Sequence, residues 1–442
     1  MKKTLIFLIC FILILTGCNK KEVETSNNIY INETSILSTT RSIIFNLVNQ
    51  NNEISDKLST EFKDEISVKA LFEQYIKYVE DLTYLGVEDP YIVNDICAYN
   101  YINFKEKTIK VYMCFDDNLQ VESLIINDLK DYEELIDNKY FKEEAVLVGN
   151  KPYLNGIITL PKNVENPSVV VMVSGSGSND MNETIGENKP FKDIAHGLAK
   201  LGIASIRFDK RTYAFYESMD IENITVYDEY FYDVSSAIHM LEKYDINPFK
   251  IYYLGHSLGG MLSFSMMYQH PELKGAIILA GSSRKLEEII YDQVKNDYIS
   301  QGLDNETIKN NMLPYEEAIK QISELNSDSK HTTILNINSE YWNSLNENSF
   351  ERYKDINDKY LILQGEKDVQ VYYETDFELL KEEFKNNKNV TLKSYENLNH
   401  LFMNSISNSI DDYNIKSKVD EKVIEDIADW INGKDILKEK KK

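Results

Sequence analysis

The stretch that most limits how this chain can fold is residues 251–260, IYYLGHSLGG. An apolar run leads to Gly255, Ser257 stands at G-x-S-x-G spacing, and a segment of helical character, SLGGMLSFSMMY, follows. A serine at a sharp strand-to-helix turn adopts a strained backbone conformation, and flanking glycines remove the side chains that would collide there. We therefore predict a nucleophile elbow that projects the Ser257 hydroxyl. The alternative is a glycine-rich turn with an idle serine, which the strand before it and the helix after it disfavour.

The segments around this turn alternate between short apolar strands and amphipathic helices. From Glu144 the chain reads as an antiparallel pair, AVLVGN and LNGIITLP, and then as strands such as SVVVMVSGSG, IASIRFDK and GAIILAGS separated by helical stretches. This order is typical of a mostly parallel sheet covered on both faces. We assign residues 144–436 to this α/β domain, with a helical insertion at about 284–357 as a lid. Tyr341 and Trp342 of the lid either line a pocket or pack inside it.

A serine hydroxyl is a poor nucleophile at neutral pH, so the elbow requires a general base and an acid that orients the base. In this fold the chain order is Ser, acid, His. His400, in SYENLNHLFM, is the predicted base, because it follows a strand-like segment and precedes the final helix. The five other histidines lie in predicted helices, in the elbow itself or in the lid: His196, His239, His256, His270 and His331.

The predicted acid comes from YLILQGEKDVQV, residues 360–371. This apolar strand ends in a polar turn, and a carboxylate there lies at the same edge of a parallel sheet as the elbow. Asp368 is the predicted orienting acid, and Glu366 is the alternative.

The tetrahedral intermediate needs hydrogen-bond donors for its oxyanion. One predicted donor is the backbone N–H of Leu258, directly after the nucleophile. The other is the backbone N–H of Ser176, in the loop after the strand VVVMV, where Gly175 and Gly177 allow a close approach.

The N-terminal part has a different pattern of apolar residues. From Ser38 to about Asn127 it shows two segments with helical spacing and then alternating aromatic and β-branched runs, which predicts a small α+β domain over residues 31–140. Cys97 and Cys114 lie on predicted strands of this domain, where they either form one disulfide or stay reduced in the core.

The first residues, MKKTLIFLICFILILTGCNK, place two lysines before an apolar run that ends in small residues and Cys18. This pattern is typical of a bacterial lipoprotein signal, and predicts removal of residues 1–17, a lipid on Cys18 and a polar tether over 18–30. The protein would then sit outside the cytoplasm, anchored to a membrane. An uncleaved anchor helix is the alternative.

The charge balance restricts partners. With 48 basic and 72 acidic residues the formal net charge is −24, which disfavours nucleic acid and anionic headgroups, so the lipid must hold the protein to the bilayer. No zinc-ligand spacing occurs, and DMNETIGEN has Ile185 where a calcium loop needs glycine. We therefore predict neither a metal nor a cofactor. The Lys-rich tail, 437–442, is expected to be disordered.

Several motifs together resemble a known family. GSGSND, TIGENKPFKDIAHGLAKLGIASIRFDKR, GHSLGG, LQGEKDVQV and LNHLFM are similar to those of extracytoplasmic α/β-hydrolases of the esterase and serine-aminopeptidase-like group. The preceding domain resembles the small NTF2-like (nuclear-transport-factor-2-like) domain of some secreted hydrolases. The resemblance implies an α/β-hydrolase fold and carboxylesterase activity on a small-molecule ester. Two departures bear on substrate preference: Ser174 replaces a usual histidine, and Met181 replaces an arginine after Asp180.

Two other functions stay open. One is a peptidase that uses the same triad on an amide substrate. The other is a binding lipoprotein whose N-terminal domain recognises a surface ligand while the hydrolase is silent. Nothing in the sequence specifies an oligomeric state.

Overall fold

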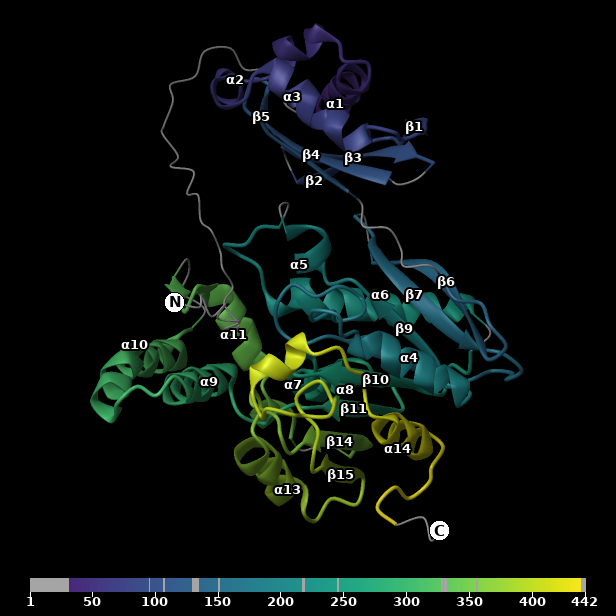
Figure 1. The fold of residues 1–442 in the computed structure, drawn as a ribbon, viewed down its shortest axis with the longest axis vertical. Helices are drawn as coiled ribbons and strands as arrows, with labels where there is room; N and C mark the ends of the chain where they lie inside the picture. Colours follow the sequence, from purple (N-terminus) through teal and green to yellow (C-terminus); the bar gives the residue numbers. More distant parts are fainter. Residues whose placement is uncertain are drawn as a thin grey trace. The chain divides into compact units, whose positions relative to one another are not determined.

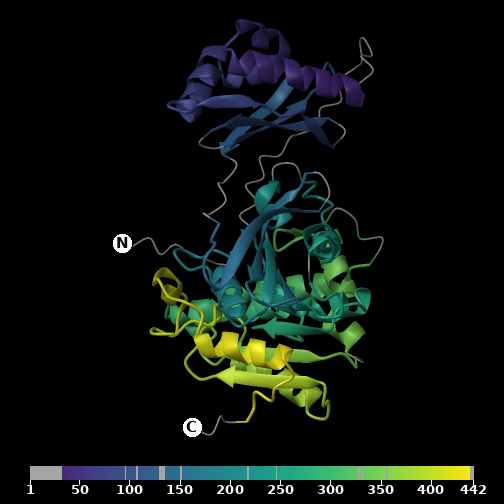
Figure 2. The ribbon, with the colours of Figure 1, turned by 90° about the vertical axis from the view of Figure 1, so that its right-hand side faces the viewer.

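The computed structural model divides into two compact units at the boundary between Glu134 and Leu135. The residues it describes are 32–94, 96–105, 108–128, 135–149, 152–216, 219–244, 246–326, 329, 332–354 and 357–438. Three sequence predictions therefore lie outside the described residues: the signal with its lipidation site Cys18 and the tether, the histidine at 331, and most of the Lys-rich tail. Figures 1 and 2 show the two units, each of which is described by itself.

The N-terminal unit packs helices on an antiparallel sheet, the α+β arrangement that the sequence predicts. Its helices are α1 (Glu33–Val48), α2 (Thr60–Glu65) and α3 (Val68–Val79), and its strands are β1 (Tyr84–Val87), β2 (Tyr91–Asn94), β3 (Cys97–Phe104), β4 (Thr108–Phe115) and β5 (Val121–Asp128). The strand order is β1-β3-β4-β5, with β2 also paired to β3. Asn32, Ser59 and Ser67 cap the three helices with their side chains, so each helix begins where the sequence supplies an acceptor.

A disulfide joins the two central strands of this sheet at one end. Cys97 of β3 lies directly opposite Cys114 of β4 in the register, and their sulfur atoms are bonded. Of the two possibilities that the sequence leaves open, the structure therefore has the paired one.

The C-terminal unit is built on an eight-stranded sheet ordered β15-β14-β11-β10-β8-β9-β7-β6. The strands are β6 (Phe141–Val148), β7 (Leu154–Pro161), β8 (Val169–Val173), β9 (Ala204–Phe208), β10 (Ile251–His256), β11 (Gly275–Leu279), β14 (Tyr360–Gly365) and β15 (Val390–Tyr395). β7 pairs antiparallel with β6 and β9, and all pairs from β9 to β15 are parallel. Every residue of β8, β10, β11 and β14 is buried, because helices cover both faces of the sheet.

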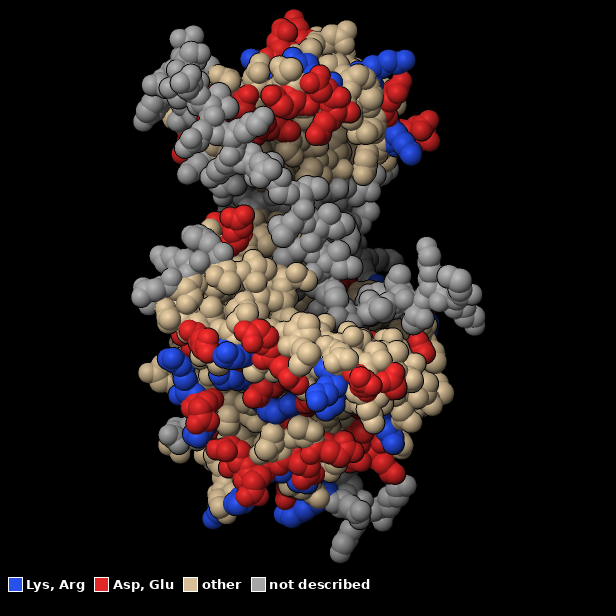
Figure 3. Space-filling model, turned by 90° about the vertical axis from the view of Figure 1, so that its left-hand side faces the viewer, with Lys and Arg blue, Asp and Glu red and all other residues tan. Residues whose placement is uncertain are grey.

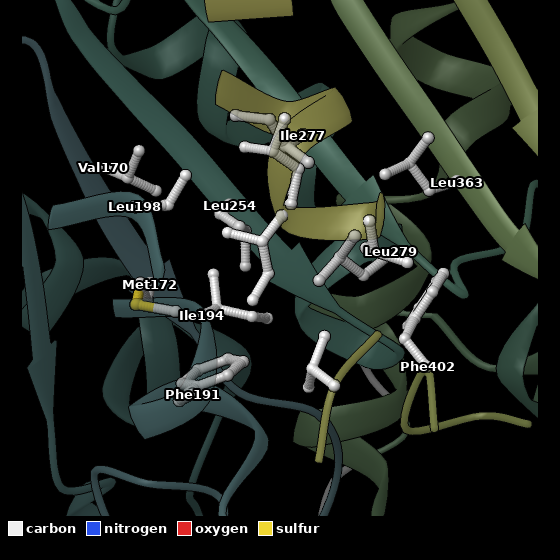
Figure 4. Packing of buried hydrophobic residues seen from close by; sticks show 14 of the residues in the cluster. Val170, Met172, Phe191, Ile194, Leu198, Leu254, Ile277, Leu279, Leu363 and Phe402 are labelled. Carbon is white, nitrogen blue, oxygen red and sulfur yellow. The ribbon is translucent and has the colours of Figure 1, made fainter. Parts of the chain in front are cut away.

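Two helices far apart in the sequence cover one face together: α4 (Pro190–Lys200) and α14 (Glu421–Ile431). Figure 4 shows Ile194 and Leu198 of α4 among the strand residues Leu254 and Ile277. Burying one such aliphatic side chain stabilises the fold by about 1.5–3 kcal/mol. The opposite face carries α6 (Tyr232–Met240), α8 (Ser263–Gln269) and α13 (Glu378–Phe384).

The insertion between β11 and β14 is helical, as predicted. It contains α9 (Leu286–Ser300), α10 (Asn305–Glu324), a two-stranded ribbon of β12 (Thr333–Ile334) and β13 (Ile337–Asn338), α11 (Ser339–Glu347) and α12 (Phe350–Tyr353). Tyr341 and Trp342 of α11 are buried inside it, and the Trp342 indole N–H donates to the carbonyl of Ile334 at 3.0 Å. Trp342 therefore packs within the lid, whereas the hydroxyl of Tyr341 reaches Glu229 outside it.

The described surface is strongly acidic in places. On the face in Figure 3, Asp and Glu side chains run in bands across the C-terminal unit, with Lys and Arg between them. Among the described residues, no helix combines the length and the apolar character that a membrane span needs.

Candidate active site

The predicted elbow lies at the end of β10. Ser257 joins β10 to the short helix α7 (Leu258–Met261) with φ +52° and ψ −119°, a region that costs a non-glycine residue about 1–3 kcal/mol. The flanking glycines are sterically required. A Cβ at Gly255 would lie 2.2 Å from the carbonyl oxygen of Gly259, and a Cβ at Gly259 would lie 2.5 Å from that of Val173. The two glycines thus make room for a strained serine.

The predicted acid and base are hydrogen-bonded to each other. His400 Nδ1 lies 2.7 Å from Asp368 Oδ2, and both residues are buried. The same carboxylate accepts the backbone N–H groups of Gln370 and Val371 on Oδ1 and the side-chain amide of Gln364 on Oδ2. Asp368 is thus surrounded by donors, which fixes the imidazole with its proton on Nδ1 and leaves Nε2 free to accept one.

The alternative acid, Glu366, has a different partner. Its Oε1 accepts the hydroxyl of Ser394 at 2.7 Å. The chain is closely packed directly before the two carboxylates, because a Cβ at Gly365 would lie 2.3 Å from the carbonyl oxygen of Leu398 in the loop before His400. This contact seats the histidine loop against the end of β14.

The segments of the nucleophile and the base are joined through the last residue of β10, which directly precedes the serine. His256 Nε2 lies 2.9 Å from the backbone oxygen of His400, and the centroids of the two rings are 4.5 Å apart. Ser257 Oγ itself forms no hydrogen bond with any described residue. A longer separation between nucleophile and base is common before substrate binds.

The loop after β8 lies directly against the nucleophile. A Cβ at Gly175 would stand 2.9 Å from the Cβ of Ser257, so glycine is needed for this approach. The predicted oxyanion donors are the N–H groups of Ser176 and Leu258, and neither donates to an acceptor in the described part of the chain. Both are thus available to a ligand at the elbow.

Glu183 is a residue of this site that the sequence pattern did not reveal. It is buried with φ +52°, and its Oε1 accepts the N–H of Gly175 at 2.7 Å and faces His256 Nδ1 at 2.9 Å. It lies in DMNETIGEN, a segment with Ile185 where a calcium loop needs glycine. In the structure Asp180 of this segment accepts the backbone N–H groups of Asn182 and Thr184, which closes a local turn.

Both ring nitrogens of His256 face oxygen atoms that can accept a hydrogen bond, an arrangement that favours the doubly protonated ring. Burial lowers the pKa of His256, but the Glu183 carboxylate and the carbonyl of His400 outweigh this effect and raise it above the ordinary value of 6.5. The buried His256 ring thus links the loop after β8, the elbow and the loop that carries His400.

The remaining described histidines have partners outside this site. His196 lies 2.8 Å from Glu143, His239 contacts the carbonyl of Ser235, and His270 contacts the hydroxyl of the same serine. The described residues contain no group of three His, Cys, Asp or Glu side chains arranged to hold a metal ion.

The two positions that depart from the resembled family are both buried. Ser174 lies at the end of β8 with its carbonyl oxygen against Gly259. Met181 donates its backbone N–H to Asp209 at 2.8 Å. Met181 thus ties the loop after β8 to the end of β9 through its main chain.

A small cavity of about 30 Å³ lies beside Leu258, the residue after the nucleophile. Residues in and directly after α7 form one wall, and the segment after β11 and the lid form the other. Its lining comprises Leu258, Met261, Leu262, Ser282, Arg284, Lys285, Leu286, Glu287, Leu345, Asn346, Asn348, Ser349 and Phe350. Arg284 is neutralised by Asp292 and Asp376, but Glu287 is buried and forms no ion pair with a described residue.

Comparison with known proteins shows the family to which this chain belongs. Residues 169–406 match the family model described as serine aminopeptidase, S33, and this range contains the elbow, Asp368 and His400. The chain belongs to the serine aminopeptidase S33 family. Esterase EstD of Thermotoga maritima is 32% identical to this family member over 384 residues, which cover 84% of this chain and 89% of that protein. This coverage exceeds the C-terminal unit alone, so the similarity extends into the N-terminal unit.

Solved structures show similarity to this S33 family member at low identity. The esterase domain of a Rhodothermus marinus protein is 17% identical and covers 65% of this chain and 97% of its own, with a TM-score of 0.40. The Pyrococcus furiosus esterase PF2001 is 16% identical and covers 59% of this chain and 83% of its own, with a TM-score of 0.38. With the family match, the sheet order and the elbow, the C-terminal unit has the α/β-hydrolase fold.

Proposed function

We propose that this chain is a serine esterase that hydrolyses carboxylic esters through an acyl-enzyme. The observation that carries the proposal is the 2.7 Å hydrogen bond between His400 and Asp368, on a loop that His256 ties to a strained elbow serine. The similarity to a protein named as an esterase over most of both chains supports the ester as substrate.

In the proposed mechanism Ser257 Oγ attacks the carbonyl carbon of the ester while its proton passes to His400 Nε2. Asp368 stabilises the imidazolium that forms, and the N–H groups of Ser176 and Leu258 bind the oxyanion. Collapse of the tetrahedral intermediate breaks the bond to the alcohol, which takes the proton from His400. Water then attacks the acyl-enzyme with His400 as base, and the carboxylic acid leaves as Ser257 regains its proton.

A fluorophosphonate probe tests this proposal. The wild type should be labelled and should hydrolyse p-nitrophenyl esters, whereas Ser257→Ala should not be labelled and should lose at least about 10⁴-fold in kcat. A folded wild type that neither reacts with the probe nor hydrolyses an ester would contradict the esterase proposal and favour a binding function. Rates across a series of acyl-chain lengths would then define the acyl group that fits the cavity.

An aminopeptidase is the second candidate, and Glu287 is the observation that favours it. This buried carboxylate lines the cavity, burial raises its pKa, and a substrate ammonium group would give it the ion pair that described residues do not supply. Comparing kcat/KM for an aminoacyl amide with that for the matching ester separates the two. The esterase proposal expects the ester to be the faster substrate by orders of magnitude.

We also propose that a lipid on Cys18 anchors the mature enzyme to the outer face of a membrane, as the residues before it predict. A labelled fatty acid should be incorporated into the wild type and not into Cys18→Ser. A wild type that stays in the membrane fraction without the label would favour an uncleaved anchor helix.

A further inference from the structure

A buried lysine supports the loop that carries the predicted oxyanion donor Ser176. Lys210 follows β9, and its ammonium group lies 3.0 Å from the carbonyl oxygen of Gly175 and 2.8 Å from that of Gly177. It also lies 2.8 Å from the hydroxyl of Tyr230 and 2.8 Å from a carboxylate oxygen of Glu229. The mechanism proposed above uses none of these three side chains.

The contacts with the Gly175 carbonyl fix the orientation of one peptide group. Besides Lys210, this oxygen accepts the hydroxyl of Tyr230 at 2.8 Å and the side-chain amide of Asn179 at 3.1 Å. In a planar trans peptide the C=O of one residue and the N–H of the next point in opposite directions. Holding the Gly175 carbonyl on the Lys210 side therefore turns the Ser176 N–H to the other side.

Lys210 acts here as a cation. The hydroxyl of Tyr230 gives its proton to Gly175, so the three N–H groups of the ammonium group face four oxygen atoms, all of which can accept. Burial lowers the pKa of Lys210 below its ordinary value, and the Glu229 carboxylate opposes that shift. Lys210 and Glu229 thus neutralise each other in the interior, and loss of one side chain would leave the charge of the other unpaired.

The same pair reaches the lid. Glu229 accepts hydrogen bonds from Thr212 at 3.0 Å and from the hydroxyl of Tyr341, which belongs to α11 of the lid. The oxyanion loop and the lid therefore share one buried carboxylate.

We propose that Lys210, together with Tyr230, is a positioning residue that presents the Ser176 N–H to the oxyanion of the transition state. This inference rests on the proposed esterase function. The lysine neither contacts substrate nor transfers a proton. An oxyanion donor acts on charge that develops only in the transition state, so its misplacement lowers kcat and leaves KM nearly unchanged.

The test compares Lys210→Met with Arg211→Met. Removing an oxyanion donor lowers kcat by about 10²–10³-fold, and we expect a loss of about 10²-fold for Lys210→Met with KM within about threefold. Arg211 is the matched control, because this neighbouring residue forms a part-buried ion pair with Asp233 at 2.6 Å and has no hydrogen bond to the loop. Arg211→Met should lose stability and keep its kcat.

A second measurement separates positioning from general destabilisation. A trifluoromethyl ketone forms a hemiketal oxyanion on the serine, so its affinity should fall in Lys210→Met by the same factor as kcat/KM. Should Lys210→Met fail to fold, Tyr230→Phe decides, because it keeps the packing and the charges and removes one donor to Gly175. We expect Tyr230→Phe to lose about threefold to tenfold in kcat.

The outcomes distinguish this inference from the function on which it rests. A wild type without ester turnover contradicts the proposed function. An active wild type beside a folded Lys210→Met with unchanged kcat and ketone affinity overturns the role of Lys210. Where only Tyr230→Phe folds, unchanged kcat in that variant overturns it equally.

Discussion

The ring of His256, the residue directly before the nucleophile, faces the backbone oxygen of His400 at 2.9 Å and so holds the loop of the predicted base. Its second nitrogen faces Glu183, whose carboxylate also accepts the N–H of Gly175 beside Ser257. Three segments that must meet for acyl transfer are therefore joined through one buried imidazole.

This arrangement predicts a pH-dependent contribution of His256 to stability. The pKa of His256 in the folded state lies above its unfolded value near 6.5. Its contribution to the free energy of unfolding is therefore complete at pH values below 6.5 and is lost as the pH rises through the folded pKa. The charged and titratable groups that act on the ring are Glu183, Asp368 and His400. Urea unfolding of wild type and His256→Gln should differ most at pH 6 and progressively less towards pH 9. A difference that stays constant over this range would contradict a charged His256.

The hydrogen bond between Asp368 and His400 predicts a large effect of Asp368→Asn. An amide in place of this carboxylate disturbs the tautomer of the imidazole, and kcat should fall by about 10³–10⁴-fold. Glu366→Gln is the matched control, because its partner is Ser394, and it should keep a kcat near that of the wild type. Steady-state ester hydrolysis measures both. If Glu366→Gln showed the larger loss, the acid would be misassigned.

The disulfide predicts a stability effect confined to the N-terminal unit. Cys97 and Cys114 are 17 residues apart, and closing a loop of about 15 residues stabilises a domain by about 3 kcal/mol. The double variant Cys97→Ser/Cys114→Ser should lower the midpoint temperature at which this unit unfolds in calorimetry, since the unit has its own core. Ester turnover should not change, because every predicted catalytic residue lies in the other unit. Loss of turnover with an unchanged transition would contradict this expectation.

The sequence predicts the residues whose signals are local. Ser257 can be predicted because Gly255 and Gly259 lie within two residues of it. Asp368 is predicted from its place after a strand, and His400 from its place before the last helix. The cysteines could be placed on strands but not paired, because the register that sets Cys97 opposite Cys114 depends on the hairpin between them.

Residues that act over long sequence separations gave no such signal. Lys210 meets Gly175 across 35 positions, and Glu183 meets His256 across 73, so only the assembled sheet brings them together. The lid helix α10 is also held by contacts between elements. It begins at Asn305, where Asp304 caps it, and continues through Pro314. Ile308 and Met312 of its first turns pack in the lid core.

A buried ion pair away from the site predicts acid sensitivity. Arg207 of β9 is fully buried and donates to Glu143 of β6 at 2.8 Å, and His196 of α4 lies on the same carboxylate oxygen. Burial raises the pKa of Glu143, but the hydrogen bond from His196 and the charge of Arg207 outweigh this and lower it to about 2. A folded pKa below the unfolded value of 4.5 gives stability that is present above 4.5 and lost as pH falls towards 2.

The loss of stability caused by Glu143→Gln should therefore depend on pH. Near pH 7 it leaves Arg207 buried without its counter-charge, and the free energy of unfolding should fall by about 3–5 kcal/mol. The loss of stability should shrink as the pH is lowered to 3, because the unfolded wild type then binds a proton at Glu143 while the folded state does not, which lowers the stability of the wild type. Glu144→Gln is the control, since Glu144 pairs with Lys142 on the partly exposed face and contributes at most about 1 kcal/mol. Urea denaturation of the three proteins between pH 7 and pH 3 measures the difference, and equal penalties for both variants would contradict a buried Glu143–Arg207 pair.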